Sequence, residues 1–297
     1  MKTILALTDH TENAIHAAKS AVMLAGALNT NLLLYNTKLI LPVATYYADY
    51  AGGPWVVDDF TQSENDNKEK MRQLAEDLQP LIAKLDPQLR KPFVHYESSE
   101  GSLAQNITDI IEKNNIELIV MGASSDSTFE HILNGSDTRA IIDHAACPVL
   151  IIPQNSDLKK LKKVIFATDF DEADIKGIHY LVKIGKLFDF KIEIVHVCPY
   201  GEKEGSVAAK EEDFFKHVDK LRYPHIRYKE IKGKNVIRRL NDLCDEDDAN
   251  ILALVHYQHS FFVRLFEHSI TRDALLHQNI PLLIFPSKME KDYKEFV

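Results

Sequence analysis

Cysteine is scarce in the 297-residue sequence, and long hydrophobic runs are missing. The three cysteines, Cys147, Cys198 and Cys244, form no CxxC pair, and such an odd, scattered set argues against a disulfide framework. The first apolar stretch, Ile4–Leu7, is too short for a signal-peptide core, and no later stretch reaches the roughly 18 apolar residues of a membrane helix. We therefore expect a protein of the reducing cytoplasm that does not associate with membranes.

Positive charge is in deficit. The chain has 35 lysines and arginines against 44 aspartates and glutamates, which gives a formal net charge of −9. An acidic surface repels the phosphates of DNA, RNA and anionic lipids, so nucleic acid is not an expected partner. We interpret the local basic patch of Lys159, Lys160, Lys162 and Lys163 as a solvated linker between domains.

Catalytic motifs are missing as well. The sequence has no G-x-S-x-G elbow, no lysine after a glycine-rich Walker loop and no H-E-x-x-H. His256, His259 and His268 are near one another, but no cysteine or clear fourth ligand accompanies them, so we interpret them as surface or capping residues. Nothing marks Glu97 and Glu100 as an acid/base pair. We predict neither a catalytic residue nor a metal site.

The chain does contain an internal repeat. The stretch KTILALTDHTENAIHAA (residues 2–18) aligns with KVIFATDFDEADIKGI (residues 163–178). In this alignment Thr8 falls on Thr168, 160 residues later. A repeat of this length indicates two related domains, which we call copy one and copy two.

A second alignment locates the difference between the copies. CPVLIIP (147–153) aligns with IPLLIFP (280–286), only 133 residues later, so copy two is shorter in its middle. We expect copy one at residues 1–154, copy two at 160–288 and a charged tail at 289–297.

Each copy alternates short apolar runs, rich in Val, Ile and Leu, with longer segments of helical periodicity. This alternation predicts a parallel sheet covered by helices on both faces. The predicted fold is therefore α/β: two tandem, doubly wound, five-stranded domains of the Rossmann-like type. In copy one, strands are predicted at Thr3–Leu7, Asn31–Tyr35, Pro92–Tyr96, Leu118–Met121 and Val149–Ile152, and helices at Asn13–Leu28, Asn65–Leu85, Leu103–Lys113 and Thr138–His144.

Polar segments of copy one should meet at one edge of its sheet. Ligands of doubly wound sheets bind beyond the carboxyl ends of the strands, near the point where the strand order reverses. Thr8-Asp9, Asn36-Thr37 and Gly101 follow the first three predicted strands. The Asp9 carboxylate could accept hydrogen bonds from a ligand, or Asp9 or Thr11 could cap the next helix, and the sequence leaves both readings open.

The loop after the fourth predicted strand, MGASSDSTFEHILNGSDTRA (121–140), has the layout of a phosphate-binding loop. Gly122 and Gly135 would let backbone amides approach an anion closely. Ser136 opens a predicted helix, whose free N–H groups and positive dipole end attract phosphate. A Gly-Ser pair before a helix is also ordinary capping, so the loop alone does not decide its role.

Together these elements resemble the ATP-binding universal stress proteins. The resemblance rests on T-D after the first strand and on G-x2-G-x9-G-[S/T] after the fourth, and it extends over both copies. It implies an adenine nucleotide in copy one (ATP, AMP or another), with Mg²⁺ as a companion of the phosphates. It also implies that the T-D motif, Thr8 and Asp9, and Thr37 face the adenine end, and that ribose and phosphates are faced by Met121, Gly122, Ser125, Gly135, Ser136 and Asp137.

The loop departs from the family's pattern at two positions. Ser125 replaces the second glycine, which costs roughly 1–2 kcal/mol if that position needs a positive φ. Asp137 brings a negative charge to the phosphates, so either Mg²⁺ accommodates it or affinity falls. Asn36 also replaces a histidine usual in the family, which copy two keeps as His196.

Copy two departs much further. Val255, Gln258 and His268 fall on the positions of the first glycine, the serine and the last glycine of the loop, and only Ser269 is kept. Bulky side chains would stand where amides should touch phosphate. We predict that copy two does not bind ATP in the family's manner and acts as a degenerate partner domain.

Three functional hypotheses follow. The first is a stress-response protein in which nucleotide binding to copy one regulates docking to an unidentified protein partner. The second is a scaffold of the same family without a nucleotide, and the third is an enzyme with weak ATP hydrolysis. In the family, domains pair through their last strands, so Val149–Ile152 and Leu282–Phe285 are expected to pair within this chain. Whether that pair forms a further homodimer stays open.

The segment at residues 41–60 has no counterpart in copy two. It holds Tyr46, Tyr47, Tyr50 and the only tryptophan, Trp55. It either folds back as a satellite core or serves as a lid or a partner surface.

Overall fold

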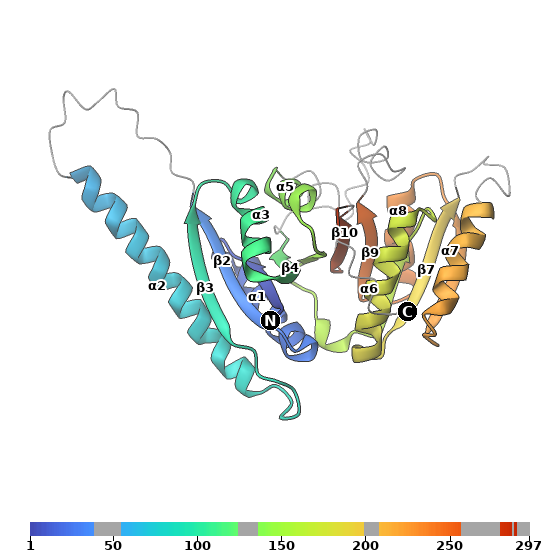
Figure 1. Ribbon diagram of the computed structural model, residues 1–297, viewed down its shortest axis with the longest axis horizontal. Coiled ribbons are helices and arrows are strands. Elements are labelled where there is room, and N and C mark those ends of the chain that lie inside the picture. Colours follow the sequence, from blue (N-terminus) through green and yellow to red (C-terminus); the bar gives the residue numbers. More distant parts are fainter. Residues whose placement is uncertain (39–54, 124–135, 199–207, 257–279, 287, 290–297) are drawn as a thin grey trace, which may run out of the picture.

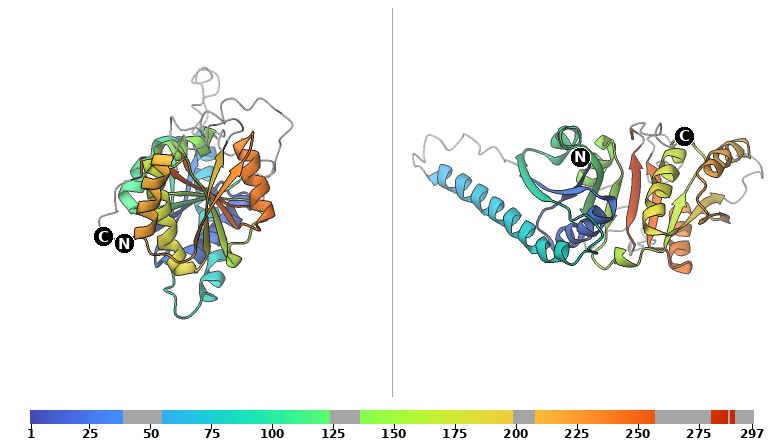
Figure 2. Two further views of the ribbon diagram at one scale, coloured as in Figure 1. Left: turned by 90° about the vertical axis from the view of Figure 1, so that its right-hand side faces the viewer. Right: turned by 60° about the horizontal axis from the view of Figure 1, so that its bottom comes forward.

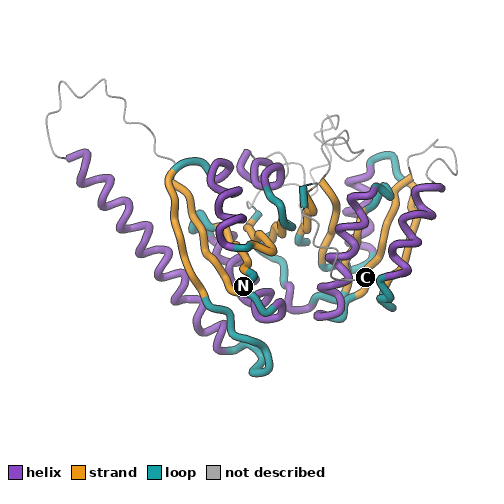
Figure 3. The backbone as a smooth tube through the Cα atoms, viewed as in Figure 1, coloured by secondary structure: helices purple, strands orange, loops and turns teal. Residues whose placement is uncertain are grey.

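The computed structural model describes residues 1–38, 55–123, 136–198, 208–256, 280–286 and 288–289. A single ten-stranded sheet runs through these residues, with strand order β3-β2-β1-β4-β5-β10-β9-β6-β7-β8 (Figure 1). The two copies form its two halves, and helices lie on both of its faces (Figures 2 and 3). None of the described helices is long and apolar enough to span a membrane.

Copy one alternates strands and helices as the sequence predicts. Every strand pair within it is parallel. Its elements are β1 (Thr3–Leu7), α1 (Glu12–Leu28), β2 (Asn31–Lys38), α2 (Trp55–Ala83), β3 (Val94–Glu100), α3 (Leu103–Asn114), β4 (Ile116–Gly122), α5 (Ser136–His144) and β5 (Val149–Ile152).

Copy two repeats this order over a shorter length. Its internal strand pairs are also parallel. Its elements are β6 (Lys163–Ala167), α6 (Glu172–Phe188), β7 (Lys191–Cys198), α7 (Ala208–Lys220), β8 (Ile226–Lys232), α8 (Val236–Glu246), β9 (Ile251–His256) and β10 (Leu282–Pro286). The predicted fold class, two doubly wound five-stranded domains in one chain, is confirmed.

The copies join through their last strands. β5 and β10 pair antiparallel, with Leu150 opposite Leu283 and Val149 opposite Ile284. Both strands are fully buried, because apolar residues fill both of their faces. The predicted pairing within one chain is therefore confirmed, and each strand covers the edge that the other would otherwise expose.

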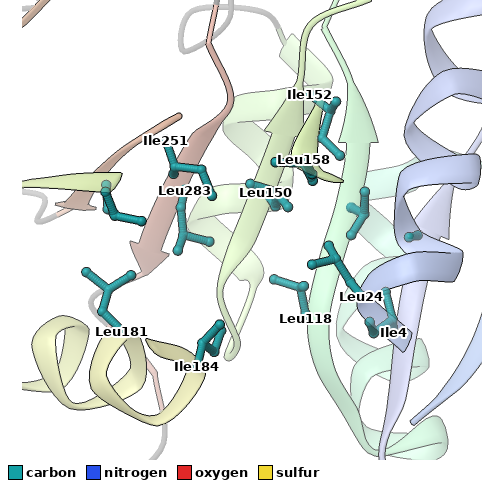
Figure 4. Packing of buried hydrophobic residues seen from close by; sticks show 14 of the residues in the cluster. Ile4, Leu24, Leu118, Leu150, Ile152, Leu158, Leu181, Ile184, Ile251 and Leu283 are labelled. Atoms are coloured by element: carbon teal, nitrogen blue, oxygen red, sulfur yellow. The ribbon is translucent and has the colours of Figure 1, made fainter. Parts of the chain in front are cut away.

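Alternation along the strands sends side chains into two apolar layers. One layer packs under α1, α2, α6 and α7, and the other under α3, α5 and α8. Both layers continue across the seam between the copies. Figure 4 shows this in the first layer, where Leu150 of β5 lies beside Leu283 of β10.

Several predicted boundaries need correction. β2 continues to Lys38 because β3 pairs with it up to Glu100, so Asn36 and Thr37 lie inside the strand and not after it. α2 begins ten residues before the predicted start, so residues 55–60 of the aromatic segment are helical, while 41–54 lie outside the described residues.

The linker prediction is partly wrong. A short 3-10 helix at Leu158–Lys160 lies between the copies, as expected of a connection. Lys163, however, is the first residue of β6, and its ammonium forms ion pairs of 2.8 Å with Glu193 and 2.9 Å with Asp247. This lysine is therefore a paired residue of the sheet and not a solvated linker residue.

Candidate functional site

The turn after β1 is fixed by its own hydrogen bonds. The Thr8 amide donates to the carbonyl of Tyr35 on β2 (2.9 Å), and the His10 amide donates to Thr8 Oγ1 (3.1 Å). His10 has a φ of 66°, in the left-handed region that few residues other than glycine adopt and where histidine, asparagine and aspartate are enriched. The turn therefore has one defined shape, with the buried Thr8 at its base and Asp9 exposed at the sheet edge.

Asp9 and Thr11 both form hydrogen bonds at the start of α1. Asp9 Oδ1 accepts hydrogen bonds from the Thr11 amide (3.0 Å) and the Thr11 hydroxyl (2.6 Å). Thr11 is the N-cap, and its hydroxyl oxygen accepts from the Ala14 amide. Thr11 is thus the cap, and Asp9 positions it. Asp9 still presents its carboxylate to solvent, so it can also accept hydrogen bonds from a ligand.

The contacts of Asn36 explain how it can replace the histidine that is usual in the family. Its side-chain amide is buried and donates to the carbonyl of Thr8 (2.6 Å), which ties β2 to the turn. In copy two, His196 Nδ1 donates to the carbonyl of Thr168 in the same way (2.9 Å). Asparagine and histidine supply the same bond, so this replacement does not alter the frame. Thr37 is the next residue of β2 and is half-buried.

Gly122 is required by packing. A Cβ added there would lie 2.6 Å from the backbone C and O atoms of Asn13 at the start of α1. The Asn13 side chain also donates to the carbonyl of Ala123, which draws the helix onto the end of β4. The position of this glycine is therefore explained without an anion, although the same close approach keeps the strand end free of side-chain bulk. Met121 beside it is half-buried.

Gly101 closes the third strand by a different requirement. Its φ of +98° is one that other residues rarely adopt. Ser102 then caps α3 in a capping box with Gln105. Gly101 is therefore a structural turn residue at the edge where the sequence expects it.

The rest of the predicted loop is only partly described. Ser125 and Gly135 lie outside the described residues, and of Ser136 and Asp137 the structure describes the backbone alone. α5 begins at Ser136, two residues before the predicted helix and where Ser136 was expected to open one. Its first turn supplies N–H groups with no partner inside the helix, which suit an anion.

The corresponding turn of copy two is closed by a buried carboxyl group. Asp174 accepts from the Thr168 hydroxyl (2.7 Å) and from the amides of Asp169 (3.0 Å) and Asp171 (3.2 Å). Burial raises the pKa of Asp174 to about 7. The hydrogen bonds that its carboxylate accepts lower this pKa in part, and the charge of Asp169 raises it further. Copy one has Ala14 at this position, so its turn lacks this carboxyl group.

The end of β9 in copy two also differs from the end of β4 in copy one. Val255 stands at the position of Gly122 and is buried. His256 Nε2 lies 3.2 Å from Asp143 Oδ1 of α5, across the seam. His259 and His268, like Gln258 and Ser269, lie outside the described residues.

Cys147 and Cys244 are buried and carry free thiols. Burial raises the pKa of the Cys147 and Cys244 thiols to about 12, so neither forms a thiolate near neutral pH.

Comparison with known proteins identifies the family. The model of the universal stress protein family matches residues 1–153. The chain belongs to the universal stress protein family. A universal stress protein of Methanocaldococcus jannaschii is 28% identical over 153 residues, which are 51% of this chain and 81% of that protein.

Solved universal stress proteins share the layout of the whole chain. A crystal structure from Archaeoglobus fulgidus has a TM-score of 0.67 at 15% identity and covers 95% of both chains. A second, from Pseudomonas aeruginosa, has a TM-score of 0.55 at 14% identity and covers 95% of this chain and 92% of that one. At such identity the likeness concerns the fold, here two copies in one chain.

Two residues near this edge were missed by the sequence reasoning. His10 follows the T-D motif directly, but its side chain lies 3.0 Å from Asn67 Oδ1 on α2. The position of His10 could have been noticed from the motif. Asn67 gives no such signal, because only the packing of a distant helix brings it to the turn.

Proposed function

We propose that copy one binds an adenine nucleotide, ATP in the first place, and that the protein is a nucleotide-dependent regulator in the stress response. One observation carries this proposal. β1 and β4 are neighbours at the point where the strand order of copy one reverses, and Ala6 pairs with Val120. Thr8-Asp9, which follow β1, therefore lie beside Met121-Gly122 at the end of β4, where doubly wound sheets bind ligands.

The division of roles follows from the chemistry of these groups. Asp9 offers a carboxylate to an amino or hydroxyl group at the adenine end, with Thr8 and Thr37 beside it. Gly122, Ser125, Gly135 and Ser136 would serve the phosphates with backbone amides and hydroxyls, next to Met121. A Mg²⁺ ion would compensate the charge of Asp137 against the phosphates. AMP or another adenine nucleotide would use the same adenine end.

Copy two supports a single site per chain. Val255 brings a branched side chain to the end of β9, and Asp174 occupies the hydrogen-bond donors of the turn after β6. A nucleotide would have to displace both. Copy two is therefore proposed as the partner domain that completes the sheet.

A nucleotide-free scaffold is the second candidate. It is favoured by Gly122, whose presence the packing of α1 already explains, and by the charge of Asp137. In that case an unidentified protein partner would bind irrespective of ATP. Weak ATP hydrolysis remains the third candidate, and none of the described residues supports it.

Titration calorimetry with ATP and Mg²⁺ tests the proposal. The wild-type chain should bind at micromolar concentration with one site per chain, and Gly135→Val should lose this binding. His268→Val, at the matching position of copy two, is the control and should bind as the wild type does. Absence of heat and of any thermal shift at millimolar ATP would reject the nucleotide and favour the scaffold.

A further inference from the structure

α2 is the most unequal element of the two copies. It has 29 residues, whereas its counterpart α7 has 13. Its C-terminal part packs on α1 and β3, and the N-terminal end projects beyond the sheet (Figures 1 and 2). The buried apolar residues of the packed part are Met71, Leu74, Ala75, Leu78 and Ile82.

Asn67 is the contact of α2 nearest to its projecting end among the side chains that the structure describes as buried. It is 7% exposed, and its Oδ1 lies 3.0 Å from His10 Nε2. Its Nδ2 is buried without a hydrogen-bond partner among the described residues. The contact is polar and lies where the buried apolar face of α2 ends. Ends of elements with few buried apolar contacts are where proteins open locally.

His10 connects this contact to the proposed nucleotide site. It directly follows Asp9, and its amide is bonded to Thr8 Oγ1. Because the turn has one defined shape, a ligand that fixes Asp9 also fixes the backbone of His10 and so the direction of its ring. The ring then either meets the Asn67 amide or does not.

Among the described residues of copy two, an apolar contact stands at the matching place. Phe170 stands at the position of His10, with a φ of 60°, and its ring packs edge-on against Phe214 of α7 at 5.7 Å. Several further aromatic contacts surround Phe170, so α7 is fixed by apolar packing. A hydrogen bond depends more sharply on distance and angle than such packing does, so only copy one has a contact that a small shift of the turn can make or break.

We propose that nucleotide binding in copy one is transmitted to α2 through His10 and Asn67. The inference rests on the proposed function, and it names α2 as the element whose position reports occupancy of the site. A nucleotide that binds Asp9 restrains this turn further, which keeps the His10 ring on Asn67 and holds the helix against the sheet. The linkage is reciprocal, so an α2 that is held well also favours the nucleotide.

Hydrogen exchange measured by mass spectrometry tests this in the full chain. With saturating ATP and Mg²⁺, exchange in residues 65–70 should slow by about fivefold or more, the lower range of usual couplings. Asn67→Leu removes the bond and keeps the burial. It should still bind ATP, about fivefold more weakly by the same reciprocity, and its α2 should no longer respond. Peptides from α7 are the internal control and should not change.

The double variant His10→Phe/Asn67→Leu guards against a simple folding defect. It installs an apolar contact like the one between Phe170 and Phe214, and α2 should then be protected with or without ATP. ATP binding that leaves exchange in α2 unchanged would overturn the inference while the proposed function stands. An equal response in Asn67→Leu would overturn it too. A wild-type chain that binds no ATP would remove both.

Discussion

Asp174 is a buried carboxyl group with a raised pKa. It lies in the first turn of α6, is 5% exposed, and is held by three hydrogen bonds from the turn before the helix. Its pKa rises from 3.8 to about 7 because burial disfavours the charged form. The folded chain therefore keeps this proton over a pH range in which the unfolded chain has lost it.

This difference predicts a pH-dependent stability. Because the folded-state pKa is the higher one, the stabilisation is complete below pH 3.8 and is lost as the pH rises to about 7. Asp174→Asn, which cannot ionise, should flatten this part of the stability curve and gain most over the wild type near pH 7. Urea unfolding at pH 5 and pH 7.5 measures it. Asp109→Asn, at an exposed site on α3, is the control, and equal slopes for wild type and Asp174→Asn would contradict the prediction.

At the residue scale, the sequence predicted where the residues of the candidate site lie better than it predicted which contacts hold them there. Thr8 and Asp9 lie at the sheet edge as expected, because a motif after a buried strand is a local signal. The packing of Gly122 against Asn13 depends on how closely α1 approaches β4, which no local pattern records. The bond between His10 and Asn67 joins residues 57 positions apart and was equally invisible.

At the scale of the elements, an ion pair joins β4 of copy one to α6 of copy two. Glu117 on β4 is 9% exposed, and its carboxylate contacts the ammonium of Lys183 on α6 and that of Lys2 at 3.2 Å. A carboxylate so far removed from water depends on its partners, because removing one leaves an uncompensated charge. This pair therefore contributes to the fit between the copies on the side of the sheet away from the proposed site.

Lys183→Met should accordingly destabilise the chain, by about 1–3 kcal/mol since Lys2 and solvent compensate part of the charge. Lys186→Met, an exposed lysine on the same helix, should have little effect. The double variant Glu117→Met/Lys183→Met should recover most of the loss, because no buried charge remains. Chemical denaturation of the four proteins measures this, and a Lys183→Met chain as stable as Lys186→Met would refute it.

Helix and strand boundaries were predictable where periodicity was strong. α1 ends at Leu28 as predicted, because Asn29 closes the helix in the left-handed conformation and its amide donates to the carbonyls of Ala25 and Gly26. α2 begins ten residues early, because the stretch after Trp55 mixes apolar and acidic residues without a clear period. β2 and β3 continue past their apolar cores because they pair with each other, and pairing is not written in either strand alone.

For the whole molecule, the repeat was the informative signal. The two last strands, VLII and LLIFP, are made only of apolar residues and proline and would be aggregation-prone as exposed edges, which agrees with the pairing that the family resemblance implied. The resulting sheet gives each copy a neighbour at β5 or β10 that a single domain would have to find in a second molecule. The projection of α2 was not predictable, because it depends on where its apolar face ends relative to β3.

The seam predicts how copy one behaves by itself. Residues 1–154 without copy two would expose β5 and the apolar side chains that now meet β10, among them Leu150 opposite Leu283. Such an edge pairs with another copy, so the isolated half should be a dimer that reproduces the antiparallel seam. Light scattering after size-exclusion chromatography should give twice the monomer mass, and Leu150→Lys should give monomer, since a charge on the edge opposes pairing. If the isolated half were monomeric without the lysine, the seam would add little to the stability of copy one, and the two copies would be joined by their linker more than by their sheet.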